Sequence, residues 1–401
     1  MSDLHAVHHH RPTPPAAAGG PPPGLLRLGW DDGWTATLDR HVDLHPELAT
    51  AVVGRVTRAD RGACDVLLPQ HGTPNGARSR PTVVHGARWS APLSRVVVGD
   101  PEQTPAAGDW VLLAPPDQPS AATDRWVAQA VLERRTAVRR AEAEPGSSRS
   151  QVLAANPDVV AVVEPMPGVL GRLERLLALA WSSGARPVVV LTKADLHHDP
   201  DGALAEVAAV APGVEVYAVA TPDGSGLEPL RALLAEGLTL ALVGASGVGK
   251  STLLNALVSG SGTSAEVMAT QEIRGDGKGR HTTVTRELHL CPTGGAVLDT
   301  PGVRTVGLSG GEELDEVFPE VAELAARCRF ADCAHRTEPG CAVQDAVADG
   351  ELPERRLASY RRLEREALAR AARVDARLRA AQVQEHKLRQ RAYRQRPDKK
   401  R

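Results

Sequence analysis

The 401-residue sequence has no apolar run long enough to cross a membrane, because none approaches the ~20 consecutive apolar residues that a bilayer requires. It also has no apolar signal core near its N-terminus, where histidine and proline dominate. We therefore expect a cytoplasmic protein that does not enter a membrane.

Cysteine is scarce too, with five residues in the whole chain. So few thiols in a chain of this length exclude a disulfide framework. Cys64 and Cys291 stand alone in the sequence, and we expect them in the apolar interior. The other three gather near the C-terminus in a spacing that is typical of metal binding.

Neither charge nor aromatic content identifies a partner. The formal net charge is −2, and aromatic residues make up 3% of the chain. Lys and Arg nevertheless far outnumber Asp and Glu from Glu354 to Arg401. This tail shows helical periodicity. Its first half fits a charged helix with internal ion pairs, whereas its last residues favour binding to RNA phosphates.

The first third of the chain divides into two parts. Residues 1–47 are rich in Pro, Gly and His, and we expect them to be unstructured. Residues 48–145 contain five short Val- and Leu-rich runs, which predict an OB-like five-stranded β-barrel. Such barrels often bind nucleic acid, and Glu133–Arg140 is a basic strip suited to phosphates. A barrel that serves only for packing is the alternative, because only three tryptophans are available to stack on bases: Trp89, Trp110 and Trp126.

The middle of the chain alternates between strand and helix signals. Continuous apolar runs at Asp158–Pro165, Pro187–Asp195 and Val214–Ala220 are suited to buried parallel strands, and a helix-like stretch follows each run. This alternation predicts a doubly wound α/β sheet whose ligand-binding loops lie at the carboxyl ends of the strands.

A glycine loop then follows another apolar run and precedes a helical pattern. Its sequence GASGVGKST matches the G-x-x-x-x-G-K-[ST] pattern in the required strand–loop–helix context. The glycines allow backbone N–H groups to face phosphates, the lysine reaches the outer phosphates, and the serine ligates magnesium. The predicted nucleotide-binding residues are Gly244, Ala245, Ser246, Gly247, Val248, Gly249, Lys250, Ser251 and Thr252.

A second segment, TKAD, ends the Pro187–Asp195 run and comprises Thr192, Lys193, Ala194 and Asp195. The Asp195 carboxylate is suited to accept hydrogen bonds from the ring N–H and exocyclic amine of guanine, which adenine does not offer in that arrangement. Lys193 would lie along the base and brace the glycine loop. The occurrence of this tetrapeptide together with the glycine loop supports a guanine-binding site.

A third segment, DTPGV, begins at Asp299, which is placed to hold magnesium through water, and the Gly302 N–H is placed to sense the terminal phosphate. The Gly-rich, charged segment before it resembles a switch. Either Thr282 or Thr283 would supply the second protein oxygen to the metal. A solvated basic loop is the plainer interpretation of that segment.

The C-terminal region carries the spacing C-x4-C-x-H-x5-C, made of Cys328, Cys333, His335 and Cys341. Three thiolates and one imidazole complete a tetrahedral zinc site and leave no coordination position open for catalysis, so we expect a structural site. Buried reduced cysteines beside an unrelated histidine are the alternative.

These motifs stand in an unusual order, because TKAD precedes the glycine loop and DTPG follows it. Together with GDWV, NPD, GRHTT and EPGC, they resemble the ribosome small-subunit-dependent GTPase A family of bacterial assembly factors. The resemblance implies a circularly permuted P-loop GTPase domain over 146–312 and a helical zinc-binding domain with a basic tail over 313–401. The sequence resembles the family from about residue 49 to about residue 385.

The resemblance also implies a GTP hydrolase with GTP, Mg²⁺ and Zn²⁺ as ligands. It would be stimulated by the small ribosomal subunit, contact its rRNA, act late in its maturation and leave after hydrolysis. We expect a monomer. Two positions depart from the family pattern. Thr192 replaces a frequent asparagine, which weakens one expected guanine contact, and Val303 replaces a frequent aromatic residue.

Many GTPases orient the attacking water with a glutamine after the DxxG glycine, which Val303 cannot imitate. We therefore expect slow intrinsic hydrolysis, with the ribosomal partner ordering the missing group and His281 as the internal catalytic candidate beside Lys250. Two other hypotheses stay open: a P-loop ATPase, and a non-enzymatic RNA-binding scaffold that holds GTP as a structural ligand.

Overall fold

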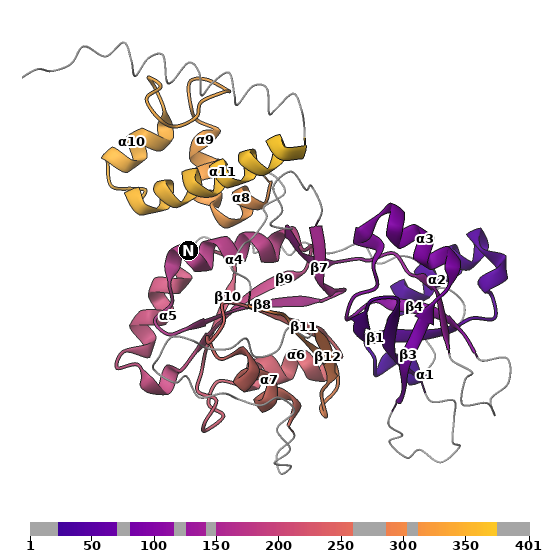
Figure 1. The fold of residues 1–401 in the computed structure, drawn as a ribbon. Coiled ribbons are helices and arrows are strands. Elements are labelled where there is room, and N and C mark those ends of the chain that lie inside the picture. The colour runs from indigo at the N-terminus through magenta and orange to yellow at the C-terminus, as the bar shows by residue number, and fades with distance from the viewer. Residues whose placement is uncertain are drawn as a thin grey trace, which may run out of the picture.

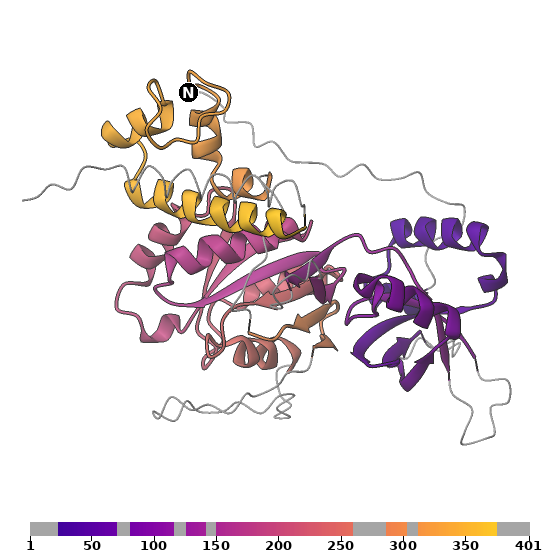
Figure 2. The same ribbon diagram turned by 45° about the horizontal axis from the view of Figure 1, so that its top comes forward.

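The computed structural model describes residues 23–69, 81–115, 126–141, 150–259, 286–302 and 312–374. Figures 1 and 2 show three parts: a β-barrel, a central sheet with helices on both faces, and a C-terminal group of helices that lies over one of those faces. None of the described helices is long and apolar enough to cross a bilayer. His281, Thr282, Thr283 and the last 27 residues lie outside the described residues.

The predicted barrel is confirmed. It closes in the order β1-β2-β3-β5-β4. Val56, Val66 and Leu113 fill its interior with other buried apolar side chains. Trp110 is completely buried, so it cannot stack on a nucleic-acid base. The strands are β1 Val52–Asp60, β2 Ala63–Leu68, β3 Thr82–Trp89, β4 Trp110–Ala114 and β5 Val127–Val131, with helices α3 Ala91–Gly99 and η2 Pro101–Gln103 between β3 and β4.

The prediction that residues 1–47 are unstructured is wrong from Pro23 onward. Helices α1 (Pro23–Leu26), α2 (Asp32–Leu44) and η1 (Pro46–Leu48) precede the barrel. The physical reason is a set of large apolar side chains, since Leu25, Leu28, Trp30 and Trp34 are all buried. Trp30 lies edge-on to Trp110 at 4.7 Å between ring centroids. The burial of these side chains outweighs the Pro- and Gly-rich composition around them.

The central sheet has the order β10-β9-β8-β11-β13-β12 and is parallel except at β12. This confirms the predicted doubly wound arrangement. Its strands are β8 Val159–Pro165, β9 Arg186–Thr192, β10 Glu215–Val219, β11 Thr239–Val243, β12 Glu287–Leu290 and β13 Ala296–Asp299. A two-stranded ribbon, β6 (Ala137–Ala141) with β7 (Ser150–Ala155), comes between the barrel and this sheet in the chain.

Both faces of the sheet are covered by helices. Val160 and Val162 pack with the apolar side chains of α4, whereas Val159 and Val163 pack with those of α6 and α7. This alternation follows from the two-residue period of a strand. The helices are α4 Leu170–Ser182, α5 Pro200–Ala208, α6 Glu228–Ala235 and α7 Lys250–Val258, and the short helix η3 Ala194–Leu196 follows β9.

The C-terminal helices dock on α4. Figures 1 and 2 show α11 running beside α4. Arg356 of α11 is buried at this contact, where its Nη1 donates to Glu174 Oε1 of α4 at 2.8 Å. Its Nε donates to Glu320 Oε1 of α9 at 2.7 Å. The helices are α8 Glu312–Val317, α9 Pro319–Ala325, α10 Ala342–Ala348 and α11 Glu354–Val374.

Candidate nucleotide and metal sites

The glycine loop connects the carboxyl end of β11 to the first turn of α7. Gly247 and Gly249 have φ angles of 81° and 102°, in the left-handed region where a side chain is strained. Gly244 lies so close to β8 that a Cβ there would be 2.4 Å from the Val163 carbonyl oxygen. The loop therefore needs glycine at these positions in order to fold over the edge of the sheet.

Lys250 is buried and its ammonium group turns back onto the loop. Its Nζ donates to the carbonyl oxygens of Gly244 at 3.0 Å and Ala245 at 2.9 Å. Burial lowers the pKa of Lys250, whereas the negative charges of Asp299 and Glu164 act in the opposite direction. The cation is thus positioned among the loop carbonyls and close to two acidic groups.

Asp299 ends β13 next to the strand that carries the loop, and its side chain is buried. Burial raises the pKa of Asp299 to about 6, although attraction to Lys250 opposes the shift. Its Oδ1 is buried and has no hydrogen-bond partner among the described residues. A buried carboxylate oxygen without a partner is costly unless it binds a cation, and carboxylate oxygens are ligands that Mg²⁺ prefers. The residue therefore fits the predicted magnesium site.

TKAD lies directly against the glycine loop. Thr192 is buried, and its Oγ1 donates to the Val248 carbonyl oxygen at 2.5 Å across 56 residues of sequence. Thr192 therefore braces the loop, and the same role for Lys193 stays a prediction. Lys193 has a φ of 60°, which is uncommon outside glycine. Asp195 lies in η3 with its side chain exposed, so its carboxylate is accessible to a ligand.

The DTPG segment meets the same loop. A Cβ at Gly302 would lie 2.9 Å from the Ser246 backbone nitrogen, so the two backbones are in close contact. Thr300 Oγ1 donates to the Leu242 carbonyl oxygen at 2.6 Å and ties this segment to β11. Three segments far apart in the sequence thus converge on one edge of the sheet. Their individual roles toward a nucleotide stay predictions, as do those of His281, Thr282 and Thr283.

Sequence reasoning missed an ion pair at this edge. Glu164, near the end of β8, is completely buried and pairs with Arg172 of α4 through both carboxylate oxygens. The sequence held one signal for it, because Glu164 is the only charged residue within the otherwise apolar strand β8.

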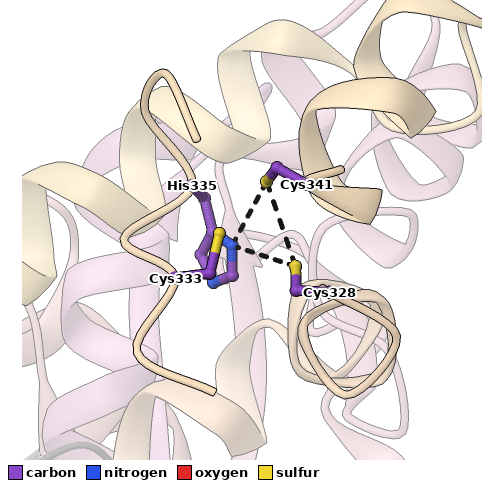
Figure 3. Close-up of side chains that lie close together, drawn as sticks. All are labelled: Cys328, Cys333, His335 and Cys341. Carbon is purple, nitrogen blue, oxygen red and sulfur yellow. Dashed lines mark hydrogen bonds between the residues drawn. The ribbon is translucent and has the colours of Figure 1, made fainter. Parts of the chain in front are cut away.

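The predicted Cys3His group comes together in the C-terminal module (Figure 3), with all four ligand atoms within 4.8 Å of one another. His335 Nδ1 is 3.5 Å from the sulfur atoms of both Cys328 and Cys341, and those sulfurs are 3.9 Å apart. A zinc tetrahedron with bonds of about 2.3 Å to sulfur and about 2.0 Å to nitrogen has edges of about 3.5 to 3.8 Å. The distances among Cys328, His335 and Cys341 therefore fit zinc, and Cys333 lies near enough to supply the fourth donor.

Two side chains hold the histidine loop in shape. The Glu338 carboxylate accepts backbone N–H groups from Ala334, Arg336 and Thr337, which lowers the pKa of Glu338 to about 2. Gln344 Nε2 donates to the His335 carbonyl oxygen at 2.6 Å. These contacts keep His335 in its left-handed conformation, with a φ of 55°. Its ring thereby remains directed at the sulfur atoms.

The chain is similar in sequence to known proteins of one family. The family model RsgA GTPase matches residues 131–309. The chain is 44% identical over 368 residues to the small ribosomal subunit biogenesis GTPase RsgA of Streptomyces coelicolor, and the match covers 90% of this chain and 91% of that protein.

Two solved structures share the fold. YjeQ from Thermotoga maritima aligns with a TM-score of 0.55 and 26% identity, covering 79% of this chain and 99% of that one. YloQ, described as a circularly permuted GTPase, aligns with a TM-score of 0.51 and 23% identity, covering 80% and 96%. The permuted order of motifs, the convergent loops and the extent of the sequence match agree, and the chain belongs to the RsgA GTPase family.

Proposed function

We propose that this protein hydrolyses GTP during biogenesis of the small ribosomal subunit, in the cytoplasm. We further propose that the small subunit stimulates hydrolysis late in its maturation and that the protein, a monomer, leaves afterwards. The name of the Streptomyces coelicolor relative supports the pathway. The observation that carries the proposal is the hydrogen bond from Thr192 to Val248, because it joins the base-reading segment to the phosphate-binding loop.

In this proposal the guanine base lies against Asp195, whose carboxylate accepts the ring N–H and the exocyclic amine. The glycine-loop N–H groups surround the phosphates, and Lys250 exchanges its carbonyl partners for phosphate oxygens. Ser251 and Asp299 hold Mg²⁺ together with Thr282 or Thr283. When bound, the metal supplies positive charge to the phosphates.

Water activation is proposed to depend on His281 and on the small subunit, since Val303 has no polar side-chain atom. If this is correct, His281→Ala reduces stimulated hydrolysis while leaving GDP affinity intact. Unchanged stimulated hydrolysis would remove His281 from the mechanism.

Zinc is proposed as a structural ligand of Cys328, Cys333, His335 and Cys341. Their four donors leave no open position, so the metal would supply cross-linking of the module and no chemistry on the nucleotide. The module and the barrel are proposed to contact rRNA, since the relatives are named for ribosome biogenesis.

The test is the rate of phosphate release from GTP, with and without purified small subunits. We expect a slow intrinsic rate, a large acceleration by small subunits, and loss of both in Lys250→Ala, because the lysine neutralises the outer phosphates. Absence of acceleration would favour the GTP-binding scaffold. Equal turnover of ATP would favour a P-loop ATPase.

A further inference from the structure

The buried Glu164 lies near the carboxyl end of β8, and the backbone of β8 there adjoins the glycine loop. The backbone of β8 touches that loop at Val163, whose carbonyl oxygen faces Gly244. The Glu164 carbonyl oxygen is 3.3 Å from Thr192 Oγ1, the same hydroxyl that bonds the loop at Val248. A carboxylate with no solvent exposure is therefore attached to the floor of the site where the phosphates are proposed to bind.

Arg172 is the cation that pairs directly with this carboxylate, and Lys250 lies near enough to attract it. Arg172 Nε donates to Glu164 Oε1 at 2.5 Å, and its Nη2 donates to Oε2. The arginine side chain is 37% exposed whereas the carboxylate is 0% exposed. Solvent can therefore stabilise the guanidinium if the pair is broken, but it cannot stabilise the carboxylate.

The residues on either side of Arg172 in α4 contact the C-terminal helices instead of the sheet. The Gly171 carbonyl oxygen accepts a hydrogen bond from Arg362 Nη2 at 3.0 Å, and Arg175 Nη2 donates to Glu366 Oε1 at 2.5 Å. Both partners belong to α11. Neighbours of Arg172 thus face the C-terminal module while Arg172 itself faces the sheet.

We propose that Arg172 is a positioning residue for nucleotide, which keeps the floor of the glycine loop electrically neutral so that a polyphosphate can bind. This inference rests on the proposed function, because it assumes that the loop binds the phosphates. A nucleoside diphosphate brings several negative charges to the loop. An uncompensated carboxylate a few residues beneath it would repel them through a medium that screens charge poorly.

The test is a calorimetric titration of the full chain with GDP and MgCl₂. Arg172→Ala should weaken GDP binding about tenfold, and Glu164→Gln in the same chain should restore affinity to within about threefold of wild type. Glu164→Gln alone should bind GDP at least as tightly as wild type, since it removes the repelling charge. Arg172→Lys should lie between wild type and Arg172→Ala.

Arg175→Ala is the matched control, because it removes an ion pair of the same helix that points away from the sheet. Its GDP affinity should equal that of wild type. The proposal is overturned if Arg172→Ala binds like wild type, if the double variant stays as weak as the single one, or if Glu164→Gln alone weakens binding. Lys250→Ala tests the proposed function separately, since retained GDP binding there would refute the site itself.

Discussion

The charges of single residues at the sheet edge are arranged for a ligand more than for stability. Lys250 and Asp299 are both buried. Burial lowers the pKa of Lys250 and raises the pKa of Asp299, and both shifts favour the neutral form of the group. Such groups cost free energy in the protein without ligand and regain it when phosphate and metal bind. Asp299 gives a measurable consequence.

The pKa of Asp299 is about 6 in the folded protein, above its ordinary value of 3.8. The folded state therefore binds more protons than the unfolded state between these values, and stability falls as the pH rises from about 4 to about 6. This fall in the free energy of unfolding amounts to about 3 kcal/mol. Asp299→Asn should abolish this pH dependence and should raise the free energy of unfolding at pH 7.5 without nucleotide.

Urea unfolding of wild type and Asp299→Asn between pH 4.5 and 7.5 measures this effect. Asp43→Asn, at an exposed position in α2, is the control and should follow wild type at every pH. A stability difference between wild type and Asp299→Asn that stays constant with pH would show that Asp299 titrates normally.

Among the elements, those with strong apolar periodicity were predictable. The barrel strands and β8, β9 and β10 appear in the sequence as Val-rich runs bounded by turn residues. Helices α1 and α2 were not predictable, because Trp30 between them and Trp34 in α2 stand among Gly and charged residues and find their partner, Trp110, some 80 positions later. The Glu164–Arg172 pair was hidden for a related reason: an acidic residue in an apolar strand indicates burial but does not identify its partner.

The contact between α4 and α11 depends on Arg356, which is 2% exposed and lies 4.3 Å above the Phe318 ring. Arg356→Ala leaves the buried Glu174 carboxylate without its cation, and breaking such a pair typically costs about 3–5 kcal/mol. Arg365→Ala, at an exposed position of the same helix, should cost less than about 0.5 kcal/mol. Urea unfolding midpoints measure both, and equal midpoints would show that Arg356 does not hold the module.

The C-terminal module should also depend on its metal. Cys328→Ser removes one of four donors, so we expect loss of bound zinc and a lower unfolding temperature, with the central sheet still folded. Elemental analysis of the purified protein and thermal unfolding check this. One equivalent of zinc retained by Cys328→Ser, Cys341→Ser and His335→Ala alike would refute the ligand assignment.

At the scale of the whole molecule, the order of the motifs matters less than the sheet that joins them. TKAD stands before the glycine loop in the chain, yet β9 and β11 both flank β8, so their carboxyl ends meet. Sequence reasoning predicted this convergence because parallel strands place their carboxyl ends at one edge. It did not predict which side chain makes the contact, since Thr192 bonds Val248 only once both strands are in register.

The most direct test of the shared site is the base preference of Asp195, measured by titrating wild type and Asp195→Asn with GDP, ADP and xanthosine diphosphate. The carboxylate accepts the two N–H donors of guanine, whereas an amide there can donate to the second carbonyl of xanthine. We expect wild type to bind GDP far more tightly than ADP, and Asp195→Asn to prefer xanthosine diphosphate. Equal binding of ADP and GDP by wild type, or an unchanged preference in Asp195→Asn, would contradict a single guanine-nucleotide site built from these distant segments.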